Sequence, residues 1–323
     1  MHKKVIVIGY TGQDGSLLVD ELIKRGDHIL GISSSKCFLH GCHYEEKSIN
    51  INDEDQVNKC LKIFKPDEVY YLAAKHDSSE FFDQTKTMYR NFLSFQEINV
   101  NGLVNFLTAI VRICPKTKLF YASSSLVFGE VESETQTEIT TFNPKEFYAI
   151  TKVQGMNLCK MFREKYNVFA STGILYNHES HLRKQNFLTS KIINTAYKIS
   201  KGSNEKLEIG NMSALVDWGY ARDFVSAFQK ILSLKKADDF IVSTGELHSV
   251  KEFVEIVFKY FKLNYSNHVI ENNNILSRIS VVRRGDYTKL KNQTGWKPSY
   301  VYKDFVVRLI NDHISYLNVS RLS

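Results

Sequence analysis

The sequence predicts an α/β fold in which a doubly wound, mostly parallel sheet is followed by a smaller C-terminal lobe. Three observations predict this fold. Short apolar runs rich in β-branched residues alternate with amphipathic helical segments, a glycine-rich turn follows the first run, and the alternation becomes less regular beyond residue 176. We therefore expect two domains, residues 1–175 and residues 176–323, the second partly interleaved with the first.

The first half of the chain has the pattern of repeated strand–helix–strand units. Val5–Ile8 is a continuous apolar run that predicts a buried strand, and a helix follows in which leucines recur at helical spacing until Gly26 ends it. The next elements are expected, in order, as a strand over 29–32, a helix over 57–64, a strand over 69–72, a helix over 98–113, a strand over 119–122, a helix over 148–166 and a strand over 169–175. Such a sheet binds ligands at the carboxyl ends of its strands.

Composition excludes several classes of protein. The chain has 323 residues, of which 43% are hydrophobic and 24% are charged, as expected for a globular protein with a large core. No apolar run approaches the roughly 20 residues of a membrane span and no signal-peptide pattern opens the chain, so we expect a cytoplasmic protein without a membrane partner. The net charge of +7 is dispersed among acidic residues, which favours a small polyanionic ligand over nucleic acid.

The five cysteines are scattered, which predicts reduced thiols. Cys37, His40, Cys42 and His43 lie within seven residues and could in principle bind zinc. Their spacing fits no paired zinc-binding pattern, so we expect no metal and interpret the segment as a surface loop.

A dinucleotide-binding motif lies in the first strand-to-helix turn. Gly9, Gly12 and Gly15 form a GxxGxxG pattern, with Thr11 and the pair Gln13-Asp14 between them. Glycines allow a tight turn and close approach of a pyrophosphate, and the helix N-terminus offers unpaired N–H groups. The sheet is therefore expected to be of the Rossmann type.

The end of the second expected strand selects between the two nicotinamide cofactors. An acidic residue there binds a ribose 2′-hydroxyl, whereas an arginine favours the 2′-phosphate of NADP. This chain has Ser33-Ser34-Ser35 and no arginine, so NAD is favoured, although Lys36 leaves the choice open. Residues 1–175 are thus the expected NAD-binding domain, and residues 176–323 the expected substrate-binding lobe.

A catalytic group is expected at the same edge of the sheet. Tyr148 and Lys152 are four residues apart on one helix face, where an ammonium can favour the phenolate form of the tyrosine. Ser124, directly after an apolar strand, can orient a substrate hydroxyl. These residue types at these separations point to hydride transfer at a secondary alcohol or ketone.

Together the motifs resemble the extended short-chain dehydrogenase/reductase family, and within it the GDP-mannose 4,6-dehydratase branch. The resemblance covers nearly the whole chain. It rests on Gly12-Gln13-Asp14-Gly15-Ser16, Leu72-Ala73-Ala74, Asn99-Val100-Asn101-Gly102, the Ser-Tyr-Lys set, residues 173–180, Gly210-Asn211 and Asp217-Trp218-Gly219.

The resemblance implies roles for particular residues. Ser124 supplies the hydroxyl, Tyr148 accepts the proton of the C4 hydroxyl, and Lys152 tunes the phenol and positions the cofactor ribose. The implied cofactor contacts are Gly9, Thr11, Gly12, Gln13, Asp14, Gly15, Ser33, Asn50, Ile51, Leu72, Ala73, Ala74, Tyr148 and Lys152. The implied substrate contacts are Ser124, Ser125, Leu126, Asn177, Arg183, Lys191 and at least one of Arg278, Arg283 and Arg284.

The chain departs from the branch at Leu126, where dehydratases carry a glutamate that moves the protons of the elimination. Leucine cannot move a proton, so C4 oxidation is expected to proceed without dehydration. His76 or Glu80 could replace the missing group. Leu215-Val216 stands where relatives have an arginine, and Asn50 where they have an acidic residue near the adenine.

The expected activity is therefore NAD-dependent oxidation of a GDP-linked manno-configured sugar to its 4-keto form. The nearest resemblance is to the GDP-manno-heptose 4-dehydrogenases of capsule-heptose pathways, which implies GDP-D-glycero-D-manno-heptose as substrate. A C4 epimerase, a 4,6-dehydratase or a non-catalytic NAD-binding partner remain alternatives. Family members commonly form homodimers or homotetramers through the helices expected at 98–113 and 148–166.

Overall fold

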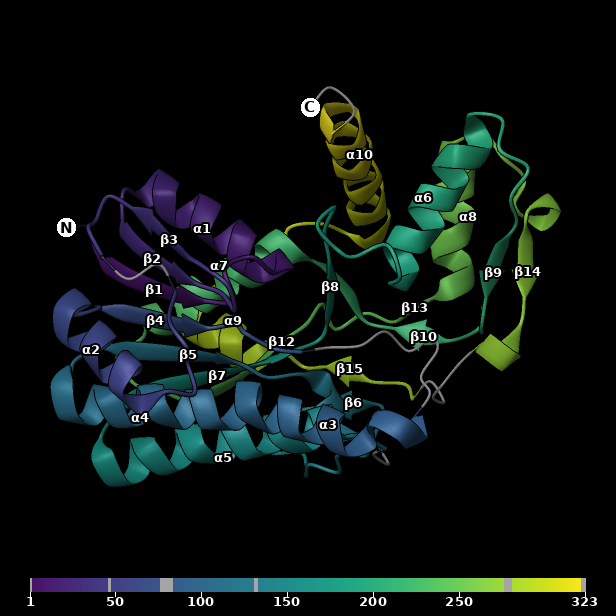
Figure 1. Ribbon diagram of the computed structural model, residues 1–323. Coiled ribbons are helices and arrows are strands. Elements are labelled where there is room, and N and C mark those ends of the chain that lie inside the picture. The colour runs from purple at the N-terminus through teal and green to yellow at the C-terminus, as the bar shows by residue number, and fades with distance from the viewer. Residues whose placement is uncertain (1, 46–47, 76–83, 131–132, 276–280, 321–323) are drawn as a thin grey trace.

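The computed structural model describes residues 2–45, 48–75, 84–130, 133–275 and 281–320 (Figure 1). Within them, the central sheet has seven strands in the order β12-β7-β5-β4-β1-β2-β3. Their bounds are β1 Lys4–Ile8, β2 His28–Ile32, β3 Cys37–His40, β4 Glu68–Tyr71, β5 Lys118–Ala122, β7 Phe169–Leu175 and β12 Asp239–Val242. All neighbouring strands are parallel except β2 and β3. The predicted doubly wound parallel sheet is confirmed.

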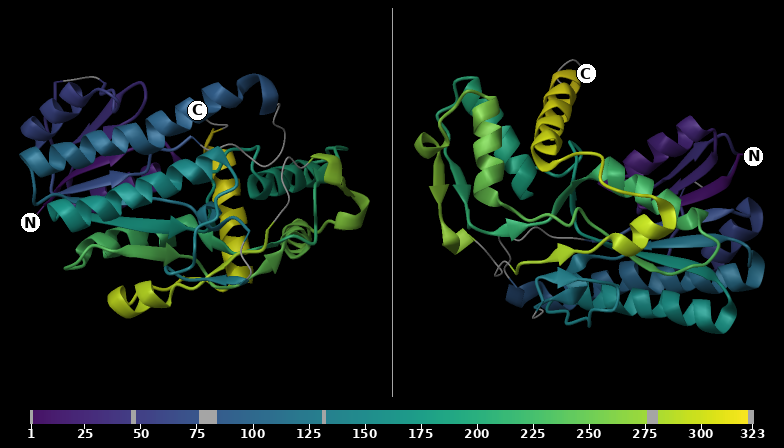
Figure 2. Two further views of the ribbon diagram at one scale, coloured as in Figure 1. Left: turned by 90° about the horizontal axis from the view of Figure 1, so that it is seen from below. Right: turned by 180° about the vertical axis from the view of Figure 1, so that it is seen from behind.

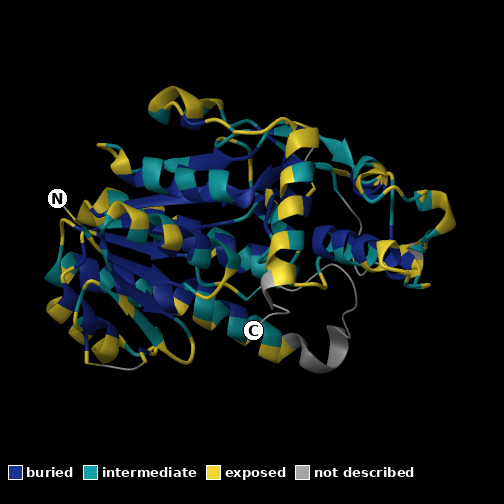
Figure 3. Ribbon diagram, turned by 90° about the horizontal axis from the view of Figure 1, so that it is seen from above, coloured by how far each residue is buried: buried dark blue, intermediate teal, exposed yellow. Residues whose placement is uncertain are grey.

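Helices cover both faces of the sheet because successive strand residues point to opposite sides. Val5 and Val7 pack toward one face, and Ile6 and Ile8 pack toward the other. The first face is covered by α1 Gln13–Arg25, α7 Ala221–Ser233 and α9 Thr288–Thr294, and the second by α2 Glu54–Phe64, α4 Gly102–Ile113 and α5 Phe147–Tyr166. Figure 3 shows the sheet strands as the most deeply buried part of the molecule.

The helix expected over 98–113 has a more complex form. Helix α3 (Gln84–Gln96) continues into a π-helical turn (Glu97–Asn101) before α4 begins. A π turn inserts one extra residue into the helical ladder and is frequent at functional sites. It carries Asn99, which is fully buried.

A second group of elements forms the lobe around a separate apolar core. Its helices are α6 Leu188–Ser200, α8 Val250–Tyr260 and α10 Tyr302–Ser320. Its strands form the pairs β8 Asn177–Glu179 with β11 Trp218–Tyr220, β10 Leu215–Val216 with β13 His248–Ser249, and β9 Leu207–Ile209 with β14 Val269–Glu271. Short elements complete the fold, namely β6 Thr135–Gln136 paired with β15 Arg284–Gly285, and 3-10 turns at Ser125–Phe128, Tyr265–Asn267 and Asn273–Ile275. None of the described helices is long and apolar enough to cross a membrane.

The chain returns from the lobe to the sheet through α7, β12 and α9, so segments beyond residue 176 pack against the first part of the chain (Figures 1 and 2).

The prediction of a surface loop around Cys37 and His40 is wrong, because these residues form edge strand β3. The alternation of apolar and polar residues is weak in this strand, because none of its residues is fully buried. Among the described residues, no group of three metal-ligating side chains could hold a metal ion.

Candidate active site

The glycine turn has the backbone that a dinucleotide pyrophosphate requires. Gly9 has a φ of 87°, and a Cβ atom there would lie 2.7 Å from the backbone nitrogen of Ala73. A Cβ at Gly15 would lie 2.2 Å from the carbonyl oxygen of Gly9. Side chains at either position would fill the turn, and Gln13 and Asp14 begin α1, where N–H groups have no helical acceptor. The residues present therefore fit a nicotinamide dinucleotide.

The side chains of this turn bind the loop that follows β7. His178 places Nε2 3.0 Å from an Asp14 carboxylate oxygen and Nδ1 2.7 Å from the carbonyl oxygen of Tyr176. Gln13 donates to the carbonyl oxygen of His178 and accepts from the hydroxyl of Ser180. The predicted cofactor residues Gln13 and Asp14 thus use their side chains to join the two loops and present only their backbone to a phosphate.

Both ring nitrogens of His178 lie within hydrogen-bond distance of oxygen atoms, so the ring connects Asp14 to the backbone of Tyr176. Burial alone would raise the pKa of Asp14, but the interaction with His178 leaves that pKa below its ordinary value. The ring of His178 is also stacked on Phe224, with 4.4 Å between the ring centroids.

The remaining predicted cofactor residues surround the same edge of the sheet. Ser33 closes the turn between β2 and β3 by donating its hydroxyl to the carbonyl oxygen of Lys36. Asn50 is exposed, and its Oδ1 accepts from the N–H of Asn52. The carbonyl oxygen of Ile51 accepts from Asn105. Leu72, Ala73 and Ala74 directly follow β4, next to the glycine turn.

Ser124 lies where β5 ends. It caps the 3-10 turn that begins at Ser125, and its Oγ accepts from the N–H of Leu126 at 3.3 Å. Leu126 is therefore adjacent to the Ser124 hydroxyl and is partly buried. The backbone of Leu126 thus contacts the Ser124 hydroxyl, and the residue at this position has an apolar side chain.

Lys152 is buried directly behind this turn. Its Nζ donates to the carbonyl oxygen of Ala122 at 2.8 Å, and lies 5.6 Å from the ring centroid of Tyr148 and 4.8 Å from that of Tyr121. Burial lowers the pKa of Lys152 from 10.5 to about 7. The expected grouping of Tyr148 and Lys152 behind the end of β5 is present.

Three supporting residues were not predicted as members of the site. Asn99 donates to Thr151, and Thr151 donates to the carbonyl oxygen of Tyr148, so the π turn holds the start of the catalytic helix. The ring of Phe95 meets that of Tyr148 edge to face at 6.1 Å. The motif Asn99-Val100-Asn101-Gly102 was the one sequence feature that pointed to Asn99. Spacing along the chain does not reveal that Asn99 contacts Thr151.

The expected substrate residues lie on several elements that follow β7 in the chain. Asn177 is exposed at the start of β8, and Lys191 lies half-buried in α6. Arg183 donates to Glu179 and to the carbonyl oxygen of His178. Arg283 donates to the carbonyl oxygen of Gly129 at the end of the Ser124 turn.

Arg284, one of the candidate arginines, has a partner outside the Ser124 turn. Nε and Nη2 of Arg284 both donate hydrogen bonds to the hydroxyl of Thr135. Arg284 therefore joins β15 to β6. Arg278, His76 and Glu80 lie outside the described residues.

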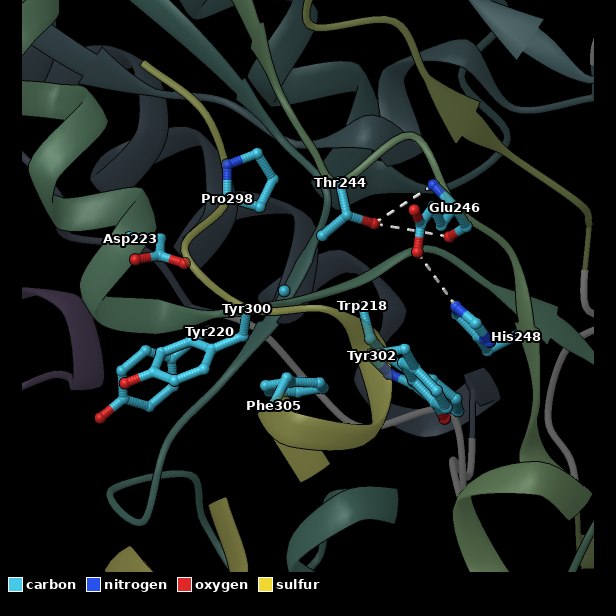
Figure 4. Close-up of a pocket in the computed structure, with 11 residues that line it drawn as sticks. Trp218, Tyr220, Asp223, Thr244, Glu246, His248, Pro298, Tyr300, Tyr302 and Phe305 are labelled. Carbon is cyan, nitrogen blue, oxygen red and sulfur yellow. Dashed lines mark hydrogen bonds and ion pairs between the residues drawn. The ribbon is translucent and has the colours of Figure 1, made fainter. Parts of the chain in front are cut away.

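Asp217 has a structural role that its motif did not reveal. Its carboxylate accepts from the backbone of Thr244, Gly245 and Gly285 and from the Thr244 hydroxyl. Nearby, Figure 4 shows an aromatic pocket around Trp218 and Tyr302. Its volume of about 10 Å³ holds one water molecule at most and excludes a sugar nucleotide.

A family model described as GDP-mannose 4,6 dehydratase matches residues 6–309. The chain belongs to the GDP-mannose 4,6 dehydratase family. GDP-mannose 4,6 dehydratase 1 of Arabidopsis thaliana is 32% identical over 336 residues, which cover 97% of this chain and 90% of the relative. The GDP-mannose 4,6 dehydratase of Dictyostelium discoideum is 35% identical over 278 residues, 80% of this chain and 76% of the relative. The expected membership in the dehydratase branch is confirmed.

Solved structures support the fold of this family member. RMD from Pseudomonas aeruginosa, determined with NADPH, superposes with a TM-score of 0.80 at 21% identity, over 97% of this chain and 99% of that one. UDP-glucose 4-epimerase from Thermus thermophilus, determined with NAD, gives 0.76 at 22% identity, over 96% and 98%. At these identities the two neighbours show the fold alone, and that fold agrees with the predicted Rossmann-type sheet followed by a smaller lobe.

Proposed function

We propose that this member of the dehydratase family oxidises C4 of a GDP-linked manno-configured sugar and releases the 4-keto sugar nucleotide without dehydration. The glycine turn at Gly9, Gly12 and Gly15 would hold NAD, which when bound would supply the acceptor for the C4 hydride. The observation that carries the proposal is Leu126, which lies next to the Ser124 hydroxyl and has no group that can move a proton.

Three residues would carry out the first half-reaction under this proposal. Ser124 orients the C4 hydroxyl, Tyr148 takes its proton as the C4–H bond breaks, and the carbonyl product forms. The ammonium of Lys152 stabilises the phenolate of Tyr148. Elimination would then require removal of the C5 proton and protonation of the departing C6 oxygen, and Leu126 supplies neither step.

Mass spectrometry of the reaction products tests the proposal. The enzyme is incubated with NAD and either GDP-mannose or GDP-D-glycero-D-manno-heptose. The proposal expects a product two hydrogens lighter than the substrate, together with NADH. We propose the heptose as the preferred sugar and a capsule-heptose pathway as its setting, on resemblance of sequence.

A 4,6-dehydratase is the main alternative, and the names of the relatives favour it. A product lighter by one water, with no net NADH, would establish dehydration and refute the proposal. An epimerised sugar of unchanged mass would establish a C4 epimerase. NAD binding without any conversion would support a non-catalytic partner.

We further propose that the chain works in the cytoplasm, as a homodimer or homotetramer without nucleic-acid or membrane partners. The division into an NAD-binding domain, 1–175, and a substrate-binding lobe, 176–323, is also proposed. Segments α7, β12 and α9 interleave the second part with the first.

A further inference from the structure

Two tyrosines on neighbouring strands make hydrogen bonds to the π turn. Tyr71 and Tyr121 occupy the same register position on β4 and β5, and both are fully buried. The Tyr71 hydroxyl donates to the carbonyl oxygen of Ile98. The Tyr121 hydroxyl donates to the next carbonyl oxygen, that of Asn99, at 3.1 Å. The face of the sheet that carries both tyrosines is covered by α4 and α5 (Figure 1).

Each tyrosine hydroxyl occupies space that a glycine leaves open. A Cβ atom at Gly102 of α4 would lie 2.4 Å from the hydroxyl oxygen of Tyr71. A Cβ atom at Gly155 of α5 would lie 2.3 Å from the hydroxyl oxygen of Tyr121. In a close-packed interior a larger residue at either glycine would push the tyrosine ring away from the helix. The surroundings of the two hydroxyls are therefore equivalent.

The two tyrosines differ in what lies against their rings. The Nζ atom of Lys152 lies 4.8 Å from the ring centroid of Tyr121. The ring of Tyr71 packs instead against the rings of Phe106 and Tyr121. A cation over an aromatic face is attracted by the ring quadrupole, and this attraction is strongest where water is excluded. Of the two rings, that of Tyr121 can therefore stabilise a charge.

Among the described residues, the ammonium of Lys152 has no carboxylate partner. Its Nζ donates to the carbonyl oxygen of Ala122, and burial lowers its pKa from 10.5 to about 7. The titratable groups that face it are Tyr121 on β5, and Tyr148 and the thiol of Cys159 on its own helix, α5. The other elements packed against α5, namely α3, α4, the π turn, β7 and the 3-10 turn after β5, contribute no ion pair to it within the described residues.

We propose that Tyr121 is a positioning residue for hydride transfer, whose ring keeps the ammonium of Lys152 charged and next to the phenol of Tyr148. The hydroxyl bond to the π turn holds the ring in place, and Gly155 leaves the space that the ring needs. The part in hydride transfer rests on the proposed function, because it acts through Tyr148 and Lys152. The effect of the ring on the charge of Lys152 does not, because that charge is measured without a sugar nucleotide.

NMR of the full chain, labelled with carbon-13 in its lysine side chains and saturated with NAD, measures the ionisation of Lys152. The resonance that is missing from Lys152→Met identifies this residue, and its position is followed as the pH is raised. Tyr121→Leu should lower the titration midpoint by at least about 0.5 pH unit, because the buried ammonium loses the aromatic face. Tyr71→Leu is the matched control, since it removes an equivalent ring and hydroxyl, and should change the midpoint by less than about 0.2 pH unit.

A second pair of variants moves the rings without removing them. The new Cβ of Gly155→Ala should push the Tyr121 ring away from α5 and should therefore also lower the midpoint. Gly102→Ala is its control, because it makes the same substitution in a helix and displaces Tyr71 instead. This pair tests the contact even if Tyr121→Leu does not fold.

The pH dependence of NADH formation connects the ring to the reaction. Because the proposed C4 oxidation requires charged Lys152, the alkaline limb of the rate should move to lower pH in Tyr121→Leu by the same amount as the NMR midpoint. A wild type that forms no NADH from any GDP-sugar would refute the proposed function, and the NMR midpoints would still decide the effect of the ring. Unchanged midpoints in Tyr121→Leu and Gly155→Ala, equal shifts in their controls, or a shifted midpoint with an unmoved rate profile would overturn the inference.

Discussion

Lys152 combines an ammonium group with surroundings that disfavour its charge. The side chain is 1% exposed, and no carboxylate of the described residues forms an ion pair with it. Its pKa falls from 10.5 to about 7 because of burial. Below pH 7 the folded and unfolded chains both carry the charge, so the folded state bears the full desolvation cost. Between pH 7 and pH 10.5 the unfolded chain binds more protons, and the free energy of unfolding therefore rises with pH.

Lys152→Met should consequently stabilise the cofactor-free protein more at about pH 6 than at about pH 9.5, by up to about 1.4 kcal/mol per unit of the pKa shift. The lost hydrogen bond to Ala122 affects both measurements equally. Urea denaturation at the two pH values measures the difference. Lys160→Met, at an exposed position of the same helix, should show no such dependence. Equal effects of Lys152→Met at both pH values would contradict the assignment.

Tyr148→Phe removes the proton acceptor and little volume. We expect NADH formation to fall by about 10²- to 10⁴-fold while NAD affinity is unchanged, because the phenol acts only when the C4–H bond breaks. Stopped-flow absorbance of NADH and equilibrium dialysis of NAD measure the two quantities. Tyr166→Phe, at the exposed end of the same helix, is the control. A Tyr148→Phe enzyme with the wild-type rate would refute the proposed role.

Sequence spacing could predict where a residue lies when its position depends only on its own helix or strand. Tyr148 and Lys152 share a helix face, and Ser124 directly follows a strand, so their placement needed no distant contact. His178 and Asp14 are 164 residues apart, and their pairing depends on how the loop after β7 meets α1. Such a contact leaves no periodic signal in the chain. For the same reason, the sequence did not reveal the hydrogen bonds of Asp217 to backbone N–H groups of two distant segments, 244–245 and 285.

The bridge between α1 and strand β8 should contribute measurably to stability. A double-mutant cycle with Asp14→Asn and His178→Asn should give a coupling energy of about 1–3 kcal/mol, because the pair is largely buried and charge-assisted. The exposed pair Lys251 and Glu255 on α8 should give about 0.5 kcal/mol or less. Urea denaturation of the wild type, the four single mutants and the two double mutants measures both cycles. A coupling energy near zero for Asp14 and His178 would show that the ion pair does not form in solution.

Helices and strands were predicted best where one apolar helix face or one continuous apolar run marks the element. The strand at 169–175 agrees with the structure because its residues are almost all buried, which makes the apolar run continuous. Edge strand β3 was missed because its side chains are half-exposed, and the π turn was missed because its extra residue leaves helical periodicity nearly unchanged. The paired strands of the lobe are only two or three residues long, which is too short for an alternating pattern.

The helices α4 and α5 lie side by side on one face of the molecule (Figure 2). We expect this face to form the proposed dimer interface. Val104 is half-buried and lies outside the apolar core, so Val104→Glu should shift the protein toward the monomer of 37.3 kDa. Gln293→Glu, an exposed position on α9, makes the same charge change and should leave assembly unchanged. Sedimentation velocity measures both variants, and an unaltered Val104→Glu assembly would exclude this interface.

The bridge formed by Gln13, Asp14, His178 and Ser180 also has a thermodynamic consequence. A dinucleotide held by the glycine turn would lie against one end of the bridge, and the loop that we propose to contact the sugar nucleotide begins at the other end. A ligand that orders either side therefore orders both. Reciprocity of linked equilibria then requires that NAD tightens sugar-nucleotide binding by the same factor by which the sugar nucleotide tightens NAD binding. The binding of the two ligands is thus coupled through the same four residues, although these residues come from opposite halves of the chain.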